Sequence, residues 1–372
     1  MPDDLTTTTG TNYSSSMISS PGRAERQLVP DVLRGVAIIF MLLSHASPAW
    51  RTAPRPMIFV LGNVSGMATS LFTLVAGMSL QLLLTRTSGQ RAWVFPLQQT
   101  IRGVVLIALG LWLTWLGSWV VVILPYLGVV LIVGAPLLLL PTRAVAAICA
   151  ALWLASGAIN DWARSLPLPQ HDVLIRILDW LVLGPHYRLT TLLPFFLLGA
   201  LLARHGFRRD RLLWGMLAIA PVAYLTGPLG ERLLGWPDRL SGQYTDTLHD
   251  IGLAFAAYSV IVLLASIERA PWRTIVAAAF TPVRLLGRVA LSLYVLHVTL
   301  IHFWLLSDWP ASPYSPLLWL SVVVGVPVVG LLWWQFVGTG PLEWLLGAVT
   351  GRRKPLLRAR RPRAASPAPA PG

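Results

Sequence analysis

Long apolar stretches, broken by short polar connections that carry arginine, recur from Leu28 almost to the end of the chain. A transmembrane helix needs about 20 mostly apolar residues to cross a hydrocarbon core of about 30 Å. We predict a helix in each of ten stretches: 31–50, 57–84, 102–118, 120–140, 144–159, 189–204, 211–229, 250–267, 285–306 and 316–337. The predicted fold class is therefore all-α, a polytopic membrane helix bundle of about ten transmembrane helices.

The two ends of the chain differ from this apolar region. Residues 1–27 are rich in Thr, Ser and Gly and lack the side chains of a core, so we expect a disordered cytoplasmic tail without a signal peptide. Residues 347–372 are basic and rich in Pro and Ala, and we expect a second cytoplasmic tail there. Residues 28–346 then form a single transmembrane domain.

Arginine is concentrated on alternate connections between the predicted helices. With the N-terminus inside, the connections at 86–102, 204–211 and 268–288 and the basic tail all fall on the cytoplasmic side, as the positive-inside rule requires. An even number of helices, with both termini cytoplasmic in the plasma or inner membrane, satisfies this rule. The longest outer connection, 160–188, is either a solvated loop or a segment that lies on or dips into the membrane.

Composition supports the membrane assignment. Charged residues make up only 12% of the 372 residues, against about 25% in a typical soluble domain. The formal net charge is +14, and Lys354 is the only lysine. Because this charge lies beside the predicted helices and in the tail, we expect it to meet anionic lipid rather than nucleic acid. The single cysteine, Cys149, excludes an intramolecular disulfide and a multi-cysteine metal site.

Arg34 and His45 lie eleven positions apart in the first predicted helix. Eleven steps of about 100° return to within roughly 20° of the starting direction, about 16 Å further along the axis. Ionisable groups inside a span are costly and usually functional. Arg34 would hold an anionic group from the cytosol, and His45 would act further out as a base. The alternative is an Arg34–Asp31 pair near the lipid headgroups, with His45 at the outer interface.

A second group of candidates lies in the ninth predicted helix. Arg284 and Arg288 are one turn apart at its cytoplasmic end, and Tyr294 and His297 share a face further out. The phenol could orient the imidazole or an acceptor hydroxyl. Arg288 and His297 are expected about 180° apart around this helix. The alternative for His297 is a buried histidine whose hydrogen bonds are purely structural.

Other motifs narrow the chemistry. His249 and Asp250, at the outer end of the eighth predicted helix, are either an orienting pair on the acceptor side or simply a helix start. The predicted helix interiors otherwise lack Asp and Glu, which disfavours a proton-coupled carrier. The chain has no Walker loop, dinucleotide fingerprint, HExxH motif or serine elbow, and we expect no metal.

Four segments resemble known membrane families. The run Asp31-Val-Leu-Arg34-Gly-Val-Ala-Ile, continuing to His45, resembles the first helix of the acyltransferase-three family and is similar to the heparan-alpha-glucosaminide N-acetyltransferase group. The run Leu71-Phe-Thr-Leu-Val-Ala-Gly77-Met-Ser-Leu resembles their second helix. Two later runs resemble the C-terminal half of the bacterial membrane family of unknown function numbered 418: Gly287-Arg288-Val-Ala-Leu-Ser-Leu-Tyr294-Val-Leu-His297 and Gly340-Pro-Leu-Glu343-Trp-Leu.

The resemblance implies a protein of ten or eleven spans that moves an acyl group from cytosolic acyl-CoA to an outward-facing acceptor. It also implies that Arg34 and His45 occupy functionally important positions. Our preferred hypothesis is an acyltransferase, with acetyl-CoA the favoured donor and a hydroxyl or amine of a cell-envelope glycan or lipid as acceptor. Arg34, Arg284 and Arg288 would bind the CoA phosphates, and His45 would be the base or a transient acyl carrier. The alternatives are a carrier or flippase with Arg34 as its anion site, and a structural scaffold.

Overall fold

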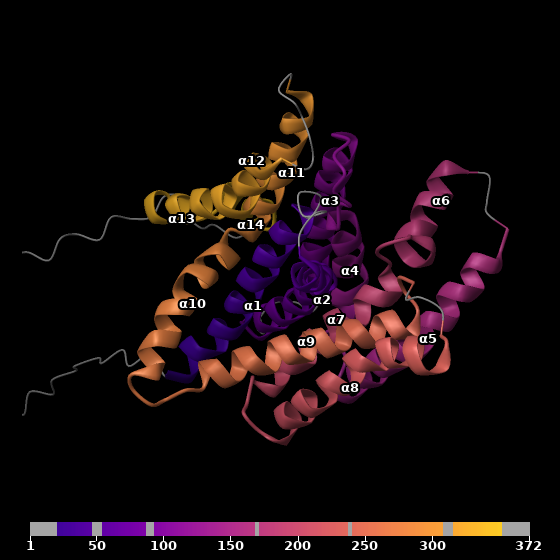
Figure 1. Ribbon diagram of the computed structural model, residues 1–372, viewed down its shortest axis with the longest axis horizontal. Coiled ribbons are helices and arrows are strands. Elements are labelled where there is room, and N and C mark those ends of the chain that lie inside the picture. Colours follow the sequence, from indigo (N-terminus) through magenta and orange to yellow (C-terminus); the bar gives the residue numbers. More distant parts are fainter. Residues whose placement is uncertain are drawn as a thin grey trace, which may run out of the picture.

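The computed structural model describes residues 21–46, 54–86, 93–167, 171–236, 240–307 and 315–351. Within these ranges the regular structure is helical, and no strand occurs in the described part of the chain. Figure 1 shows the helices packed as a bundle, with α1 (Pro21–His45) and α2 (Arg55–Arg86) near its centre. The predicted all-α membrane bundle is confirmed, whereas the orientation of the termini stays a prediction.

Seven described helices are long and apolar enough to cross a membrane. They are α1 from Leu28, α2, α3 (Val94–Trp115), α5 (Thr142–Ser165), α8 (Arg211–Leu234), α9 (Tyr244–Ala265) and the continuous run α12 (Pro316–Leu320), η3 (Ser321–Gly325) and α13 (Val326–Phe336). Two further predicted spans are shorter apolar helices, α4 (Leu124–Leu137) and α7 (Leu189–His205). Each predicted stretch therefore has a helical counterpart, although the predicted boundaries shift.

The ninth predicted helix, 285–306, is wrong as a single straight element. The structure instead has α10 (Trp272–Arg288) and α11 (Ala290–Leu306), which meet at an angle of 71°. Val289 between them leaves the helical region, with φ −116° and ψ 21°. Arg284 and Arg288 therefore lie on a different helix from His297, and the expected 180° relation about one axis does not apply.

The ends and the long connection add detail. Helix α1 begins at Pro21, earlier than the predicted domain start, and the last described helix, α14, spans Pro341–Val349. Most of both predicted tails lies outside the described residues. Within the 160–188 connection, α6 (Asp172–Leu178) and the π-helical turn η2 (Asp179–Leu183) form a short helical segment.

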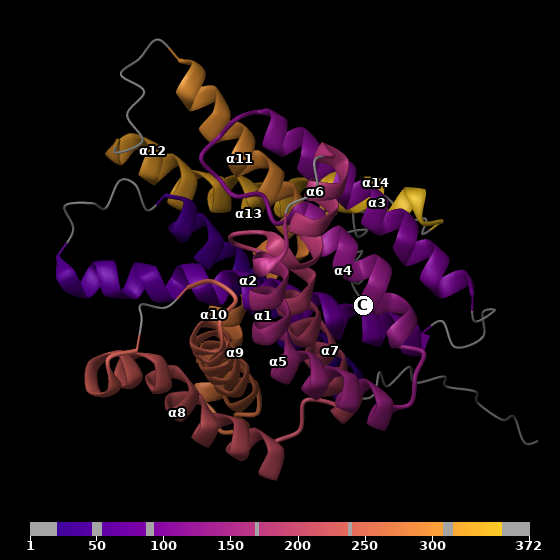
Figure 2. The same ribbon diagram turned by 90° about the vertical axis from the view of Figure 1, so that its right-hand side faces the viewer.

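Glycines bring the central helices into backbone contact. A Cβ on Gly77 of α2 would collide with the carbonyl oxygen of Phe196 in α7, and one on Gly287 of α10 would collide with that of Asp31 in α1. Small residues allow this close approach between membrane helices. Figure 2 shows α8 and α9 together on one flank of α1 and α2, with α3, α11 and α14 on the other. Of the candidate residues on α1 and α11, Tyr294 and His297 are buried, and Arg34 and His45 are half-buried.

Candidate functional site

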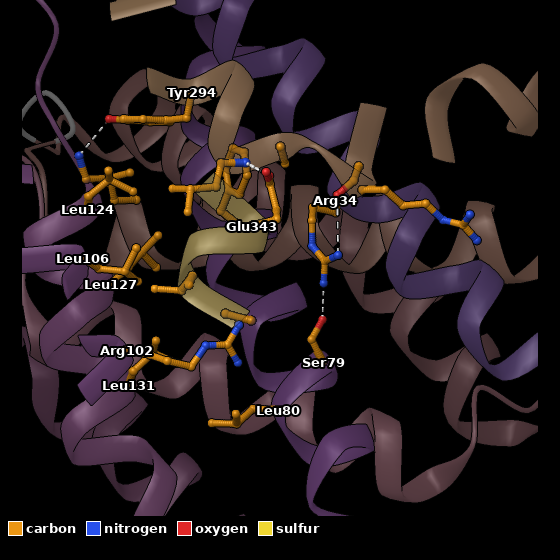
Figure 3. Close-up of a pocket in the computed structure, with 18 of the residues that line it drawn as sticks. Arg34, Ser79, Leu80, Arg102, Leu106, Leu124, Leu127, Leu131, Tyr294 and Glu343 are labelled. Atoms are coloured by element: carbon orange, nitrogen blue, oxygen red, sulfur yellow. Dashed lines mark hydrogen bonds between the residues drawn. The ribbon is translucent and has the colours of Figure 1, made fainter. Parts of the chain in front are cut away.

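Two adjoining cavities open beside the first half of α1. The basic cavity, of about 470 Å³, is lined by four arginines and two carboxylates: Arg34, Arg86, Arg102, Arg288, Asp31 and Glu343. The apolar cavity, of about 370 Å³, is lined mainly by leucines of α2, α3 and α4. Both cavities share Arg34, Ser79, Arg102, Arg288 and Glu343, and Figure 3 shows several of these side chains around the apolar cavity.

Arg34 stands where the two cavities meet. Its guanidinium donates to the Ser79 hydroxyl of α2 and lies 3.5 Å from the Gly287 carbonyl oxygen of α10. The expected i,i+3 neighbour is also present, because Arg34 Nη1 is 3.7 Å from Asp31 Oδ1. The pair with Asp31 thus forms, but Arg34 is held among three helices and lines both cavities rather than only extending toward headgroups.

The structure brings together two of the three predicted arginines. Arg288 Nε lies 3.4 Å from Asp31 Oδ2, and its guanidinium stacks over Trp334 at 5.0 Å. Asp31 therefore bridges Arg34 and Arg288. Arg284, one turn before Arg288 on α10, is not among the residues lining either cavity.

Arg102 is a site residue that the sequence alone did not single out. It comes from α3 and lines both the basic and the apolar cavity. Arg102 is the first residue of the predicted helix 102–118, and the sequence analysis counts it only as part of the cytoplasmic connection 86–102. An arginine at the start of a membrane helix is a signal that could have identified it as a site residue. The sequence does not assign Ser79 or Glu343 to the site either, whereas the fold places both in the wall of the basic cavity with Arg34.

His45 and His297 form a direct contact across the bundle. His45 Nδ1 lies 2.8 Å from His297 Nε2, and the two rings are nearly parallel, with an interplanar angle of 11°. His297 Nδ1 lies 3.2 Å from the Leu293 carbonyl oxygen. A carbonyl only accepts, so in the neutral pair His297 Nδ1 carries the proton and Nε2 accepts from His45 Nδ1. This assignment follows from the hydrogen-bond network, and it leaves the lone pair of His45 on Nε2.

Tyr294 lies against this histidine pair. Its ring meets His297 edge to face, with centroids 5.2 Å apart, so the two residues do share a face of α11. The hydroxyl oxygen accepts from the backbone N–H of Ile123 at 3.1 Å. Tyr294 therefore contacts the imidazole through its ring, while its O–H proton is available to another group.

A chain of adjoining cavities passes His45. A small cavity of about 30 Å³ contains His45 in its wall and shares Phe72, Ile123 and Tyr294 with the apolar cavity. It also shares residues with a fourth, polar cavity of about 190 Å³, namely Ser65, Thr69 and Tyr187. His45 thus lies in the wall of a small cavity between the basic and apolar cavities on one side and the polar cavity on the other, whereas its partner His297 lines none of these four cavities.

The predicted pair of His249 and Asp250 forms at the polar cavity. Asn63 donates its amide to the Phe59 carbonyl at 2.8 Å, so its Oδ1 faces His249 Nε2 at 3.1 Å. His249 Nδ1 lies 3.4 Å from Asp250 Oδ1, and Asp250 Oδ2 accepts from Ser70 at 2.8 Å. Since α9 begins at Tyr244, Asp250 lies within the helix, and the alternative of a helix-start Asp is wrong.

The carboxylates at the two ends of this chain of cavities have different surroundings. Asp250 and Asp246 line the polar cavity, whereas Glu343 is enclosed between α11 and α14. Burial raises the pKa of Glu343 above its usual range, although hydrogen bonds from Ser292 and Leu291 oppose this shift. Among the described residues, no group of three or more His, Cys, Asp or Glu side chains is placed to hold a metal ion.

Two family models match the chain. One, described as "Heparan-alpha-glucosaminide N-acetyltransferase, catalytic", matches residues 26–230, which is more than half of the chain. The other, described as "Protein of unknown function (DUF418)", matches residues 199–353. Both families are those that the sequence motifs resemble, so the predicted relationship is confirmed. No curated protein matches the chain.

Proposed function

Because the chain belongs to the heparan-alpha-glucosaminide N-acetyltransferase catalytic family, we propose that it moves an acyl group, with acetyl favoured, from cytosolic acyl-CoA to an outward-facing acceptor. The acceptor is a hydroxyl or amine of a cell-envelope glycan or lipid, and the protein lies in the plasma or inner membrane with both termini cytoplasmic. The observation that carries the proposal is the His45–His297 contact between the basic and polar cavities.

The basic cavity suits the phosphate end of the donor. Arginine's planar fork matches phosphate geometry, and charge-assisted hydrogen bonds are the strong ones. We assign this role to Arg34, Arg102 and Arg288, which all line the cavity. The adjoining apolar cavity would take the extended arm that carries the thioester toward Tyr294. Arg284 has no part in this assignment, because it lines neither cavity.

His45 Nε2 is the nitrogen that we assign to the chemistry. As a general base it takes the proton from the acceptor O–H or N–H while the acceptor atom bonds to the thioester carbonyl carbon. The C–S bond then breaks, and the departing thiolate takes up that proton. His297 accepts from His45 Nδ1 and so holds His45 in the required tautomer.

A covalent route begins at the same nitrogen. His45 Nε2 would attack the thioester carbonyl carbon, and the C–S bond would break to give an acyl-imidazolium and the CoA thiolate. In a second step the acceptor would bond to the acyl carbon, the bond from that carbon to Nε2 would break, and the acceptor's proton would pass to the thiolate. In both routes a carbonyl oxygen gains negative charge. The Tyr294 hydroxyl, which accepts from Ile123, is assigned as the hydrogen-bond donor to that oxygen.

The polar cavity suits a hydroxylated acceptor unit. It presents hydroxyls, a histidine and carboxylates: Ser65, Thr69, Ser70, Thr191, Ser241, Thr247, His186, Tyr187, Asp246 and Asp250. Such groups both donate to and accept from a polyol or an amine. His249 and Asp250, whose ring Nδ1 and carboxylate Oδ1 lie 3.4 Å apart, are both assigned to the acceptor side.

The proposal is tested by donor binding and transfer with the purified protein. A ligand that binds the native state raises its apparent thermal stability, so acetyl-CoA should stabilise the protein whereas inorganic phosphate should not. Mass spectrometry of envelope glycans and lipids incubated with protein and acetyl-CoA should show a gain of one acetyl unit. If no acyl-CoA stabilises the protein and liposomes containing it transport a lipid or small anion, the alternative of a carrier or flippase replaces this proposal.

A further inference from the structure

The N-termini of two helices, α11 and α14, meet beside the basic cavity. Neither N-terminus is capped by its own N-cap residue. Helix α11 follows the N-cap residue Val289, and α14 follows the N-cap residue Gly340; neither N-cap side chain makes a capping hydrogen bond. The first N–H groups of an α-helix have no partner within the helix. Both ends therefore need acceptors from elsewhere in the structure.

Each helix supplies the acceptor that the other lacks. Glu343 Oε1 of α14 accepts from the backbone N–H groups of Leu291 at 2.7 Å and Ser292 at 3.2 Å, in the first turn of α11. The Ser292 hydroxyl donates to Glu343 Oε2, and its oxygen accepts from the backbone N–H of Leu342 at 3.2 Å. We call this reciprocal arrangement the α11–α14 clasp.

Gly340 leaves the space that the clasp occupies. A Cβ at this position would collide with Glu343 Oε2 and would lie 2.7 Å from Ser292 Oγ. The run Gly340-Pro-Leu-Glu343 belongs to a segment that resembles the family numbered 418. The clasp gives this run a physical role, because Glu343 makes the contact with Ser292 and Gly340 leaves room for it.

The clasp lies at the start of the helix that carries His297. Helix α11 does not continue the direction of α10, since the two meet at 71°, so α10 does not by itself set where α11 points. His297 is five residues beyond Ser292, or about 7.5 Å along the axis at 1.5 Å per residue. Glu343 also lines the basic and apolar cavities. Its carboxylate thus joins the wall of these cavities to the helix of the histidine pair.

We propose that Glu343 is a positioning residue, which through the α11–α14 clasp holds His297 Nε2 within hydrogen-bond distance of His45 Nδ1. Glu343 transfers no proton in this scheme and does not touch the reacting atoms. The catalytic consequence rests on the proposed acyl transfer, whereas the positioning itself does not. The two parts are therefore tested separately.

The positioning is tested without any turnover. Full-length protein labelled with ¹⁵N-histidine is compared by NMR, and the ring signals of the His45–His297 pair are assigned by their loss in His45→Ala and His297→Ala. We expect Glu343→Ala and Ser292→Ala to remove the hydrogen-bond signature of the pair. Glu343→Gln, which keeps one acceptor oxygen for Leu291 and Ser292, should retain it in part. The matched control is Glu268→Gln, since Glu268 is an exposed carboxylate in the α9–α10 connection.

The catalytic consequence is tested by a double-mutant cycle. We expect Glu343→Ala to lower kcat by about 100-fold, the cost of a misplacement of about 1 Å at a reacting group, with KM for acetyl-CoA changed less than kcat. If Glu343 acts through His297, Glu343→Ala should have little further effect in a His297→Ala background. Glu343→Gln should recover part of the lost kcat.

The outcomes separate the two claims. An intact histidine signature in folded Glu343→Ala, Glu343→Gln and Ser292→Ala overturns the positioning role. Additive effects of Glu343→Ala and His297→Ala on kcat overturn the catalytic consequence. If Glu343→Ala and Ser292→Ala lose the histidine signature but the wild-type protein transfers no acyl group, the clasp is supported and the proposed function is overturned.

Discussion

His45 Nδ1 and His297 Nε2 are joined by a contact of 2.8 Å although the two residues are 252 positions apart in the chain. One comes from the last turn of α1 and the other from the middle of α11. The contact gives the two imidazoles different roles, because Leu293 holds the far side of His297 while His45 keeps a free lone pair. Because of this asymmetry, substitutions of the two histidines should have different effects.

His45→Ala should abolish acyl transfer, whereas His297→Ala should lower kcat by up to about 10⁴-fold, the size of loss known when the group that fixes the tautomer of a catalytic histidine is replaced. His45 carries the reacting nitrogen, and His297 only holds its tautomer. The measurement is acetyl transfer by purified variants, with gel filtration and membrane insertion as controls. Near-normal turnover in His45→Ala would remove this residue from catalysis.

Three arginines that line both donor cavities can be compared with one that lines neither. Arg34→Ala, Arg102→Ala and Arg288→Ala should each raise KM for acetyl-CoA by about 10–100-fold, because each removes a charge-assisted hydrogen bond of about 1.5–3 kcal/mol. Arg284→Ala should leave KM nearly unchanged, since Arg284 does not line these cavities. Steady-state kinetics with varied acetyl-CoA measures the effect. Equal effects of Arg284→Ala and Arg102→Ala would contradict the donor assignment.

Asp250 should affect the acceptor and not the donor. Asp250→Asn weakens the Ser70 and His249 contacts, so KM for the acceptor should rise by about 10-fold, as expected for one hydrogen bond to a charged group. KM for acetyl-CoA should stay constant. Asp161→Asn is the control, because Asp161 is an exposed carboxylate with a side chain 59% accessible. A change confined to the donor KM would place Asp250 outside the acceptor site.

Two glycines of α2 should respond oppositely to the same substitution. Gly77→Ala forces α2 away from the Phe196 carbonyl of α7 and should destabilise the fold by about 1–3 kcal/mol, the usual cost of overpacking. Gly62→Ala meets nothing within 4 Å and should be neutral or slightly stabilising, because alanine favours the helix. Thermal unfolding in detergent measures both. A lower Tm for Gly62→Ala than for Gly77→Ala would show that α2 and α7 do not pack through Gly77.

Hydropathy was sufficient for the architecture because the membrane imposes a length and an apolar composition on every span. The stretch 57–84, for example, lies within the single helix α2. The same rule missed the break at Val289, since hydropathy reports how apolar a stretch is and not whether its helix is straight. The first turn of α11, just after that break, is held by Glu343 of α14, about fifty positions further along the chain.

The sequence by itself determined a helical membrane protein, its family, and the face of α1 shared by Arg34 and His45, because helix periodicity and hydropathy are local properties. Only the tertiary structure decided which partners these residues meet. It placed His297 beside His45 and Arg102 with Arg34 at the same cavities, and it left Arg284 outside them. The physical reason is that hydrogen bonds and cavity walls depend on distances of a few ångströms between helices, and spacing along one helix does not contain those distances.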